Sequence, residues 1–390
     1  MSTSTPTWPP SYRDDADPIS PAPGYARLRA EAPVLSLPGD GPSAFWLVSG
    51  YTEVKELLAQ KSVSTSFVGR GNVSAQPGFL LSLDPPDHTR LRRLLTHEFS
   101  MRRITGMRPW LEQVCGELLE TMATGGAPAD LMAAFAVPLP SLVICELLGV
   151  PSEDRVDFQR RSDTLLDVDA TADEQRANSA EMNGYMRALV ARHREQPGAD
   201  ILGMLVREHS ENLSTDELVG IGNILLIAGH ETTANTIGLG TLLLLQHPDQ
   251  LAALRADPEL ITGAVEEILR FTSIVESGTP RIVTAEVSVG GTVIPAGDVV
   301  VVALPSANRD TDLLASPDRF DLRRQPVPHL AFGHGIHQCL GQQLARLEMA
   351  VAVPALFDRF PDLRLDTPAV ELPFRTSSPV NGLRAFPVAW

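Results

Sequence analysis

A single cysteine in a glycine-rich run constrains this chain more than any other feature of its sequence. The run reads Phe332-Gly333-His334-Gly335-Ile336-His337-Gln338-Cys339-Leu340-Gly341. Gly333 and Gly335 can adopt positive φ, which lets the backbone turn its amides toward a sulfur atom. Residues 340–349 have the pattern of a helix, whose positive N-terminal end would favour the thiolate form of Cys339. The run therefore predicts a lone anionic sulfur on a bent loop, directly before a helix.

This arrangement suits one axial ligand to a flat macrocycle. The run resembles the heme-ligand loop of the cytochrome P450 family, Phe-x-x-Gly-x-His-x-Cys-x-Gly, and it matches every defining position. The resemblance implies that the cofactor is heme b, iron protoporphyrin IX, and that Cys339 is its axial thiolate and metal ligand. A thiolate ligand favours O–O cleavage. The resemblance also implies that Phe332, Gly333, His337 and Gly341 contact the cofactor.

Two other interpretations of Cys339 stay open at this point. Most single cysteines are small buried hydrophobic residues. Zinc is a sharper alternative, because His329, His334 and His337 could join Cys339 as ligands. Structural zinc sites, however, usually combine ligand pairs at short spacings. Only His329 and His334 fit such a spacing, and the other two cysteines lie far away in the sequence.

The composition is that of an ordinary globular protein. Of 390 residues, 43% are hydrophobic and 21% are charged, which is enough for a large core. No linker or charge run divides the chain, so we expect one domain over residues 1–390. Its first part, residues 1–23, is polar and rich in Ser, Thr and Pro. We expect this part to be an irregular segment.

Charge and cysteine usage exclude several classes of protein. A net charge of −16 argues against binding to nucleic acid or to an anionic membrane surface. Three cysteines in a long chain do not form a disulfide framework and indicate a reducing compartment. The start of the chain lacks the apolar core of a signal peptide. We therefore expect a cytoplasmic, monomeric protein without a membrane anchor.

The hydrophobic pattern predicts a mainly α protein with a small β portion. Strand-like runs are found at 45–49, 286–289 and 299–304. Helical periodicity is found at 50–60, 87–124, 139–149, 152–194, 198–210, 216–247, 249–255, 258–271 and 340–359. The resemblance implies the cytochrome P450 fold, with heme between the long central helix and the helix that follows the cysteine loop.

The longest helix, 216–247, carries the second group of functional candidates. It begins after a capping box, Ser214-Thr215-Asp216-Glu217, and its centre reads Ala228-Gly229-His230-Glu231-Thr232. Glu231 is an acid in apolar surroundings, where an unpaired carboxylate is rare. The centre resembles the oxygen-binding groove of the family. That resemblance implies that Ala228 and Gly229 line the cofactor and that Glu231 and Thr232 relay protons, whereas a buried structural Glu in a kinked helix is the alternative.

Glu267 and Arg270 form an acid–base pair at helical spacing. Such a pair alone usually marks a solvated helix face. In the family, the same Glu-x-x-Arg pattern joins a basic residue in a Pro-x-x-Phe segment, which here is Pro317-Asp318-Arg319-Phe320. The resemblance thus implies a structural cluster of Glu267, Arg270 and Arg319.

Several cations match the family's contacts to the heme propionates. His88 and Arg92 follow the turn Asp84-Pro85-Pro86-Asp87 and share one face of a helix. Their alternative role is a solvated basic helix. Arg281 follows a turn, and His337 lies in the cysteine loop. By resemblance, these four side chains donate charge-assisted hydrogen bonds to two propionates.

The substrate is the least constrained part of the interpretation. The resemblance places pocket walls in the loop 62–82 and around 155–185, 274–276 and 378–381. The residues expected to bind substrate are Phe67, Phe79, Leu225, Ile274, Val275, Glu276 and Val380. This mixture of apolar and polar groups suggests a mid-sized organic molecule. If Glu276 faces the pocket, it would favour an amine or several hydroxyls.

Together these motifs imply a heme-thiolate monooxygenase, similar to those that tailor actinobacterial natural products. It would insert oxygen from O2 into a C–H or C=C bond of a small-molecule substrate, which we expect to be a secondary metabolite. No dinucleotide-binding motif is present, so electrons would come from a ferredoxin and a ferredoxin reductase. Arg102, Arg103 and Arg346 are candidates for the docking surface. The alternatives are a coupling or desaturation reaction on the same heme, or a heme protein without turnover.

Overall fold

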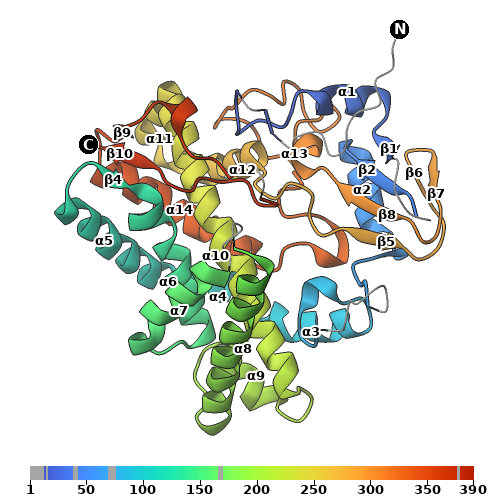
Figure 1. The fold of residues 1–390 in the computed structure, drawn as a ribbon. Helices are drawn as coiled ribbons and strands as arrows, with labels where there is room; N and C mark the ends of the chain where they lie inside the picture. Colours follow the sequence, from blue (N-terminus) through green and yellow to red (C-terminus); the bar gives the residue numbers. More distant parts are fainter. Residues whose placement is uncertain (1–12, 15, 38–42, 69–75, 166–169, 376–377) are drawn as a thin grey trace.

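The computed structural model describes residues 13–14, 16–37, 43–68, 76–165, 170–375 and 378–390. It confirms a mainly α protein with a small β portion (Figure 1). Residues 16–23 form bends and turns, and Pro21 forms an isolated bridge with Arg13. No helix in the described part of the chain is long and apolar enough to cross a membrane.

The organising element is the 32-residue helix α10 (Thr215–Gln246), which runs through the middle of the helical part (Figure 1). Its capping box is confirmed: the Glu217 N–H donates to Ser214 Oγ (3.1 Å), and the Ser214 N–H donates to the Glu217 carboxylate (2.8 Å). Most of its residues from Thr233 onward are buried. The helices packed against it are α6 (Pro138–Leu148), α8 (Ala172–Glu195), α12 (Ile261–Thr272) and α14 (Gln342–Arg359).

Two long stretches of expected helix are interrupted. The stretch 87–124 forms α3 (Asp87–Thr96), α4 (Met101–Gly106) and α5 (Arg108–Gly125). Pro109, in the first turn of α5, cannot supply the N–H that a continuous helix requires. The stretch 152–194 forms α7 (Arg155–Leu165) and α8, and α8 begins at its own capping box on Thr171. The remaining helices are α1 (Gly24–Glu31), α2 (Tyr51–Ala59), α9 (Ile201–His209), α11 (Pro248–Ala256) and α13 (Leu304–Ala307).

The β portion lies mainly beside the N-terminal helices. Its largest sheet has the order β1 (Val34–Leu37), β2 (Phe45–Val48), β8 (Val299–Val302), β5 (Arg281–Val283) and β3 (Val63–Ser64). The β2–β8 pair is parallel and aligns Phe45 with Val299, so two of the expected strands are neighbours. This sheet positions Arg281 at the start of β5.

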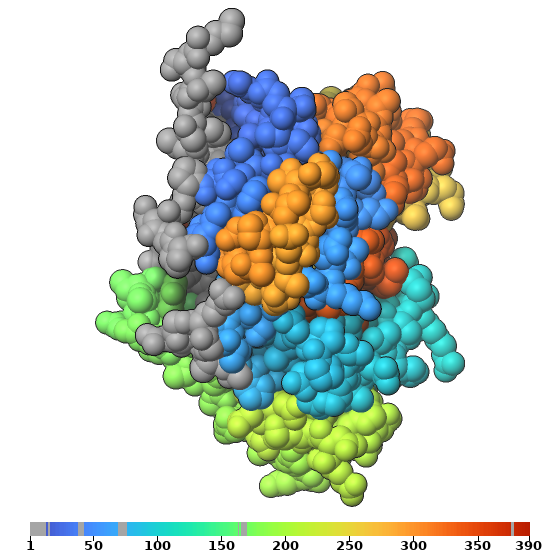
Figure 2. Space-filling view, turned by 90° about the vertical axis from the view of Figure 1, so that its right-hand side faces the viewer, coloured from blue at the N-terminus to red at the C-terminus, as the bar shows by residue number. Residues whose placement is uncertain are grey.

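Two smaller sheets complete the fold. β6 (Val287–Val289) and β7 (Thr292–Ile294) form a hairpin through Gly290 and Gly291, which both have positive φ. Figure 2 shows this hairpin in orange against the blue N-terminal segments, and the Gly290 N–H donates to Glu56 of α2 (3.0 Å). The third sheet joins β4 (Ala129–Asp130), β10 (Pro387–Ala389) and β9 (Arg364–Leu365).

Candidate functional site

The cysteine loop lies between the helical part and α2. The Cys339 N–H donates to the Phe332 carbonyl (2.9 Å), which closes the loop directly before α14. Gly333 and Gly335 have φ of 68° and 75°, as the sequence predicts. A Cβ on Gly335 would lie 2.2 Å from the Leu58 carbonyl oxygen at the end of α2, so this position admits only glycine. The loop therefore holds the cysteine in one place.

Two opposing effects act on the Cys339 thiol. Burial raises its pKa, whereas the Gly341 N–H, Arg92 and Arg346 lower it. The expected support of the thiolate by the start of the helix is thus present as the Gly341 N–H, and it opposes desolvation. A positive charge bound directly to the sulfur, as a metal ion supplies, would deprotonate it.

The four expected propionate ligands come together beside the cysteine loop. The rings of His88 and His337 have their centroids 4.2 Å apart. Arg92 donates from Nη2 to the Gln338 carbonyl (2.5 Å), and Arg281 donates from Nη1 to the Thr279 carbonyl (2.8 Å). We call His88, Arg92, Arg281 and His337 the cofactor cradle.

The cofactor cradle has little negative charge of its own, because the effect of Asp84 on the pKa of His88 and His337 is outweighed by burial and by the neighbouring cations. Burial lowers the pKa of Arg281 to about 10. Burial, followed by repulsion from His88 and Arg281, lowers the pKa of His337 to about 3. Among the described residues, neither Arg92 nor Arg281 forms an ion pair with a carboxylate, and both ring nitrogens of His88 are buried without a hydrogen-bond partner. Two carboxylates of a heme would supply the missing charge and acceptors.

Two glycines beside the cradle also fit a flat cofactor. A Cβ on Gly333 would meet no atom within 4 Å, and one on Gly341 would only touch the ring edge of Phe99 at 4.0 Å. Protein packing alone therefore does not require a glycine at position 341. The Phe332 ring packs under the Arg346 guanidinium, 4.6 Å from its centroid.

The centre of α10 has one open side. Ala228 is exposed and Thr232 is partly exposed, whereas Leu226, His230 and Thr233 are buried. The Thr232 hydroxyl donates to the Ala228 carbonyl (2.6 Å), one turn earlier. Ala228 and Thr232 are thus accessible, and the cofactor groove expected beside them stays a prediction.

Gly229 allows a neighbouring helix to approach α10. A Cβ at this position would lie 2.4 Å from Ile144 Cδ1 of α6. The missing side chain therefore makes room for α6, and a cofactor contact by the backbone of Gly229 stays a prediction.

Glu231 has a partner that the sequence did not reveal. Arg375, 144 residues later, forms an ion pair with the Glu231 carboxylate through Nη1. Burial raises the pKa of Glu231, and Arg375 opposes this rise. An acid in apolar surroundings signals that a partner should exist. Nothing in the sequence, however, identifies a residue so far away.

The expected pocket walls meet near the end of α12. Val275 and Val380 form an isolated antiparallel bridge, and Ile274 is buried beside them. Leu225 lies on α10 one turn before Ala228, and Phe79 packs against the main core. Phe67 is partly buried in the loop 62–82, of which residues 69–75 lie outside the described residues.

Glu276 is not available to a ligand in the way expected. Its Oε1 accepts a hydrogen bond from Arg13 Nε at 2.6 Å, and both side chains are buried. Arg13 also donates to the carbonyls of Thr272 (3.0 Å) and Ser273 (2.8 Å). The carboxylate is therefore neutralised by the N-terminal segment, which removes the reason to expect an amine.

The Glu267 cluster, by which we mean Glu267, Arg270 and Arg324, corrects a further assignment. Arg270 donates to both carboxylate oxygens of Glu267, at 2.8 and 2.9 Å. The third member is Arg324, which donates from Nε to Glu267 at 3.2 Å. Arg319 was the expected partner, but its side chain is 70% exposed and pairs with Asp321. The turn directs the carbonyl of Arg319 inward instead, where it accepts a hydrogen bond from Arg324 (2.9 Å).

Zinc was the alternative interpretation of Cys339. In the described part of the chain, no group of three or more His, Cys, Asp or Glu side chains could hold a metal ion, and His329 pairs with Glu266 (3.2 Å). Zinc is therefore not supported.

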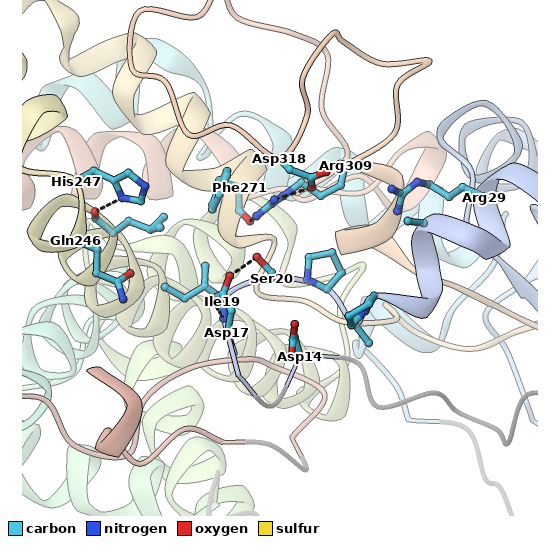
Figure 3. A pocket seen from close by; sticks show the side chains of 15 residues that line it. Asp14, Asp17, Ile19, Ser20, Arg29, Gln246, His247, Phe271, Arg309 and Asp318 are labelled. Carbon is cyan, nitrogen blue, oxygen red and sulfur yellow. Dashed lines mark hydrogen bonds and ion pairs between the residues drawn. The ribbon is translucent and has the colours of Figure 1, made fainter. Parts of the chain in front are cut away.

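A cavity of about 430 Å³ at the C-terminal end of α10 is shown in Figure 3. It lies about 20 Å along the helix from Thr232 and belongs to a different part of the molecule.

Comparisons with known proteins agree with this geometry. Residues 141–376 match the family model for Cytochrome P450. The chain is 46% identical over 379 residues to the Cytochrome P450 monooxygenase PikC of Streptomyces venezuelae, covering 95% of this chain and 91% of PikC. It is 42% identical over 391 residues to Cytochrome P450-SU2 of Streptomyces griseolus, covering 98% and 96% of the two chains.

A solved structure gives the same result. The LnmA cytochrome P450 hydroxylase from the leinamycin pathway of Streptomyces atroolivaceus superimposes with a TM-score of 0.90 at 40% identity. The alignment covers 98% of this chain and 99% of that one. The relatives match this chain over nearly its whole length. This chain also has the cysteine loop, the cofactor cradle and the accessible side of α10 described above. The chain therefore belongs to the cytochrome P450 family and is a heme-thiolate monooxygenase.

Proposed function

We propose that the protein binds heme b and uses electrons from a ferredoxin and its reductase to oxidise a mid-sized secondary metabolite. The observation that carries this proposal is the cofactor cradle, four cationic or neutral donors without an ion-paired carboxylate among the described residues, beside a fixed cysteine. A buried guanidinium without an anion is unfavourable. A bound group that brings negative charge would therefore stabilise the arrangement.

In this proposal Cys339 ligates the iron, and the cradle residues hold the two propionates. Bound heme supplies the activation of O2 through which one oxygen atom enters a C–H or C=C bond. Arg92 and Arg281 orient the macrocycle through charge-assisted hydrogen bonds, while His88 and His337 donate from neutral rings. Ala228 bounds the space on the opposite side.

Glu231 and Thr232 deliver the protons that oxygen activation requires. The Thr232 hydroxyl must leave its hydrogen bond to the Ala228 carbonyl in order to donate into the open space. Glu231 lies one residue earlier and holds a proton more readily than an exposed Glu, because burial raises its pKa. A hydroxyl beside such a carboxyl is a suitable proton relay.

The redox partner would dock near the cysteine loop. Arg102 and Arg103 are exposed on α4, and Arg103 pairs with Glu98 (2.7 Å). Arg346 is a weaker candidate than its sequence position suggests, because Glu266 binds it through both carboxylate oxygens at 2.6 and 3.0 Å. We further propose a cytoplasmic monomer formed by one domain over residues 1–390.

Reconstitution tests the proposal directly. The purified protein should retain stoichiometric heme b, and its reduced, carbon-monoxide-bound form should show the absorption band that names the family. With a ferredoxin, its reductase and ¹⁸O2, one labelled oxygen atom should enter the product of a substrate found by screening for a shift of the Soret band. Stoichiometric zinc without heme would overturn the proposal.

A further inference from the structure

The C-terminal hairpin, by which we mean residues 373–375 and 378–384, brings Arg375 to Glu231 of the proposed proton relay. The Arg375 N–H donates to the Gly382 carbonyl (2.9 Å), and Phe374 pairs with Leu383. The hairpin is attached to the pocket wall, because the Asn381 N–H donates to the Ile274 carbonyl (2.7 Å). Backbone hydrogen bonds therefore hold both strands of the hairpin, and Arg375 extends from one of them.

Contact with α10 fixes this hairpin relative to Glu231. A Cβ on Gly382 would lie 1.8 Å from Asn235 Oδ1, so only glycine allows the hairpin to approach the helix so closely. Asn235 in turn donates to the Glu231 carbonyl (3.0 Å). The guanidinium of Arg375 is thus delivered to a defined position beside the proton relay.

Arg375 has more donors than the protein uses. A guanidinium carries five N–H groups. Among the described residues, the side chain of Arg375 makes one hydrogen bond, from Nη1 to Glu231. Its Nε is buried without an acceptor, and no described residue accepts from Nη2. Buried donors without acceptors are destabilising, so a further acceptor would be bound favourably.

The charges around the pocket indicate what kind of acceptor fits. Glu276, the acid of the pocket wall, is neutralised by Arg13. Arg375 has only Glu231 as a carboxylate partner within the described residues, and its charge acts on His230 as well. Each of these two acids therefore has one arginine as its partner, so the pocket has no excess negative charge, and the unused N–H groups of Arg375 are what a further anionic acceptor would bind.

We propose that Arg375 anchors a carboxylate of the substrate beside Glu231, and that Glu231 occupies the guanidinium until the substrate replaces it. This inference rests on the proposed function and defines its substrate class as molecules that carry a carboxylate within reach of the oxidised carbon. When the substrate shares Arg375, Glu231 loses part of the interaction that keeps it ionised. Its carboxyl then takes up a proton next to Thr232, which couples substrate binding to proton delivery.

Ligands anchored on the heme test this proposal without knowledge of the substrate. The probes are ω-(imidazol-1-yl)alkanoic acids of increasing chain length, with their methyl esters and the matching ω-(imidazol-1-yl)alkylamines. The imidazole binds the heme iron of the holoprotein and shifts its Soret band, so every probe yields a dissociation constant. Comparison of the dissociation constants of the acid, the ester and the amine then shows whether the pocket prefers a negative, neutral or positive tail.

At the best chain length, the acid should bind about tenfold more tightly than its ester, as expected for one charge-assisted hydrogen bond. Arg375→Gln should remove this preference, and Arg375→Lys should retain part of it. Glu231→Gln should strengthen binding of the acid but not of the ester, because the competing carboxylate is gone. Arg384→Gln, an exposed position on the same hairpin, is the matched control and should change neither.

Equal binding of acid and ester at every chain length would overturn the inference, and so would an acid preference that survives Arg375→Gln. If Arg375→Gln does not retain heme, Arg375→Lys and Glu231→Gln still decide the question. The carbon-monoxide spectrum is recorded first on each variant. A protein with the thiolate band but no acid preference refutes the anchor and leaves the proposed function intact.

Discussion

The cofactor cradle and the Glu267 cluster both contain arginines that are wholly or partly buried, but these arginines are balanced in different ways. In the Glu267 cluster, Arg270 is fully buried and has both carboxylate oxygens of Glu267 as acceptors. In the cradle, Arg281 has one backbone carbonyl and no carboxylate among the described residues. The cluster is complete within the chain, whereas the cradle is complete only with a bound anion.

This difference separates residues that hold the fold from residues that hold a ligand. A buried ion pair that loses one partner leaves an uncompensated charge and destabilises the folded state. A cation that has no protein partner already carries that penalty. Its removal should therefore weaken ligand binding more than folding.

The largest effect is expected at the ligand to the metal. Cys339→His should abolish the carbon-monoxide band that names the family, because imidazole is not a thiolate. Circular dichroism should still show a helical protein, since Cys339 contributes no side-chain pair to the core. Persistence of the band in this variant would show that another residue ligates the iron.

The next effect concerns the completed cluster. Arg270→Met should reduce the free energy of unfolding by about 3–5 kcal/mol, because Glu267 would be left buried without its main partner. Urea unfolding of the heme-free protein measures this change.

The two arginines of the adjoining turn provide a matched comparison. Arg324→Ala should destabilise the protein by about 1.5–3 kcal/mol, since it removes a charge-assisted hydrogen bond to Glu267 together with the hydrogen bonds to three backbone carbonyls of the turn. Arg319→Ala should have an effect within about 0.5 kcal/mol, because that side chain is mostly exposed. A larger loss at Arg319 than at Arg324 would contradict the cluster as described.

The cradle should respond in the opposite manner. Arg281→Gln should increase the rate of heme loss by about tenfold or more, because one charge-assisted contact to a propionate is removed. The stability of the heme-free protein should not fall, since the buried charge has no carboxylate partner there. Transfer of heme to an excess of apomyoglobin measures the first quantity, and urea unfolding measures the second. A large loss of heme-free stability would assign Arg281 to the fold.

The proposed proton relay, Glu231 and Thr232, lies in neither the cofactor cradle nor the Glu267 cluster. Thr232→Ala should leave heme content and substrate binding unchanged but lower the product formed per electron by about tenfold, with hydrogen peroxide released instead. Thr232→Ser keeps the hydroxyl and should retain most of the yield. Thr233→Ala should have little effect, because Thr233 is buried on another side of α10. An unchanged yield in Thr232→Ala would require another donor, such as a substrate hydroxyl or an ordered water.

The last prediction concerns pH and involves an acid without a cation. Glu348 of α14 is fully buried, and burial raises its pKa to about 8. Between pH 4 and pH 8 the unfolded chain has released this proton and the folded chain still holds it, so stability falls as the pH rises. Relative to Glu348→Gln, the parent should lose up to about 1.4 kcal/mol per pH unit in this range. Parallel pH profiles of unfolding for the two proteins would show that Glu348 is ionised in the folded state.

The sequence predicted the elements and the cysteine loop well, because their signals are local. The glycines of the loop, the capping box of α10 and the pairing of Glu267 with Arg270 all depend on residues a few positions apart. Long-range partners could not be predicted in the same way. Arg375 and Arg13 find their acids only because the fold brings distant segments together, over 144 and 263 residues.

The choice between neighbouring candidates was also beyond the sequence. Arg319 and Arg324 lie in one turn, and only the direction of the backbone decides which side chain reaches Glu267. Gly229 matches the family pattern for a cofactor contact, but the rotation of α10 directs its Cβ position toward Ile144. Such outcomes depend on packing, which no local pattern records.

The attachment of Arg13 has a consequence for the evolution and engineering of this enzyme. One guanidinium joins the beginning of the chain to the backbone of residues 272–273 and to Glu276 in the substrate wall. Recombination between relatives within their first twenty residues would therefore also exchange Arg13 and its contacts to the expected substrate wall. Chimeras made in this region could change selectivity without altering any residue that touches the substrate.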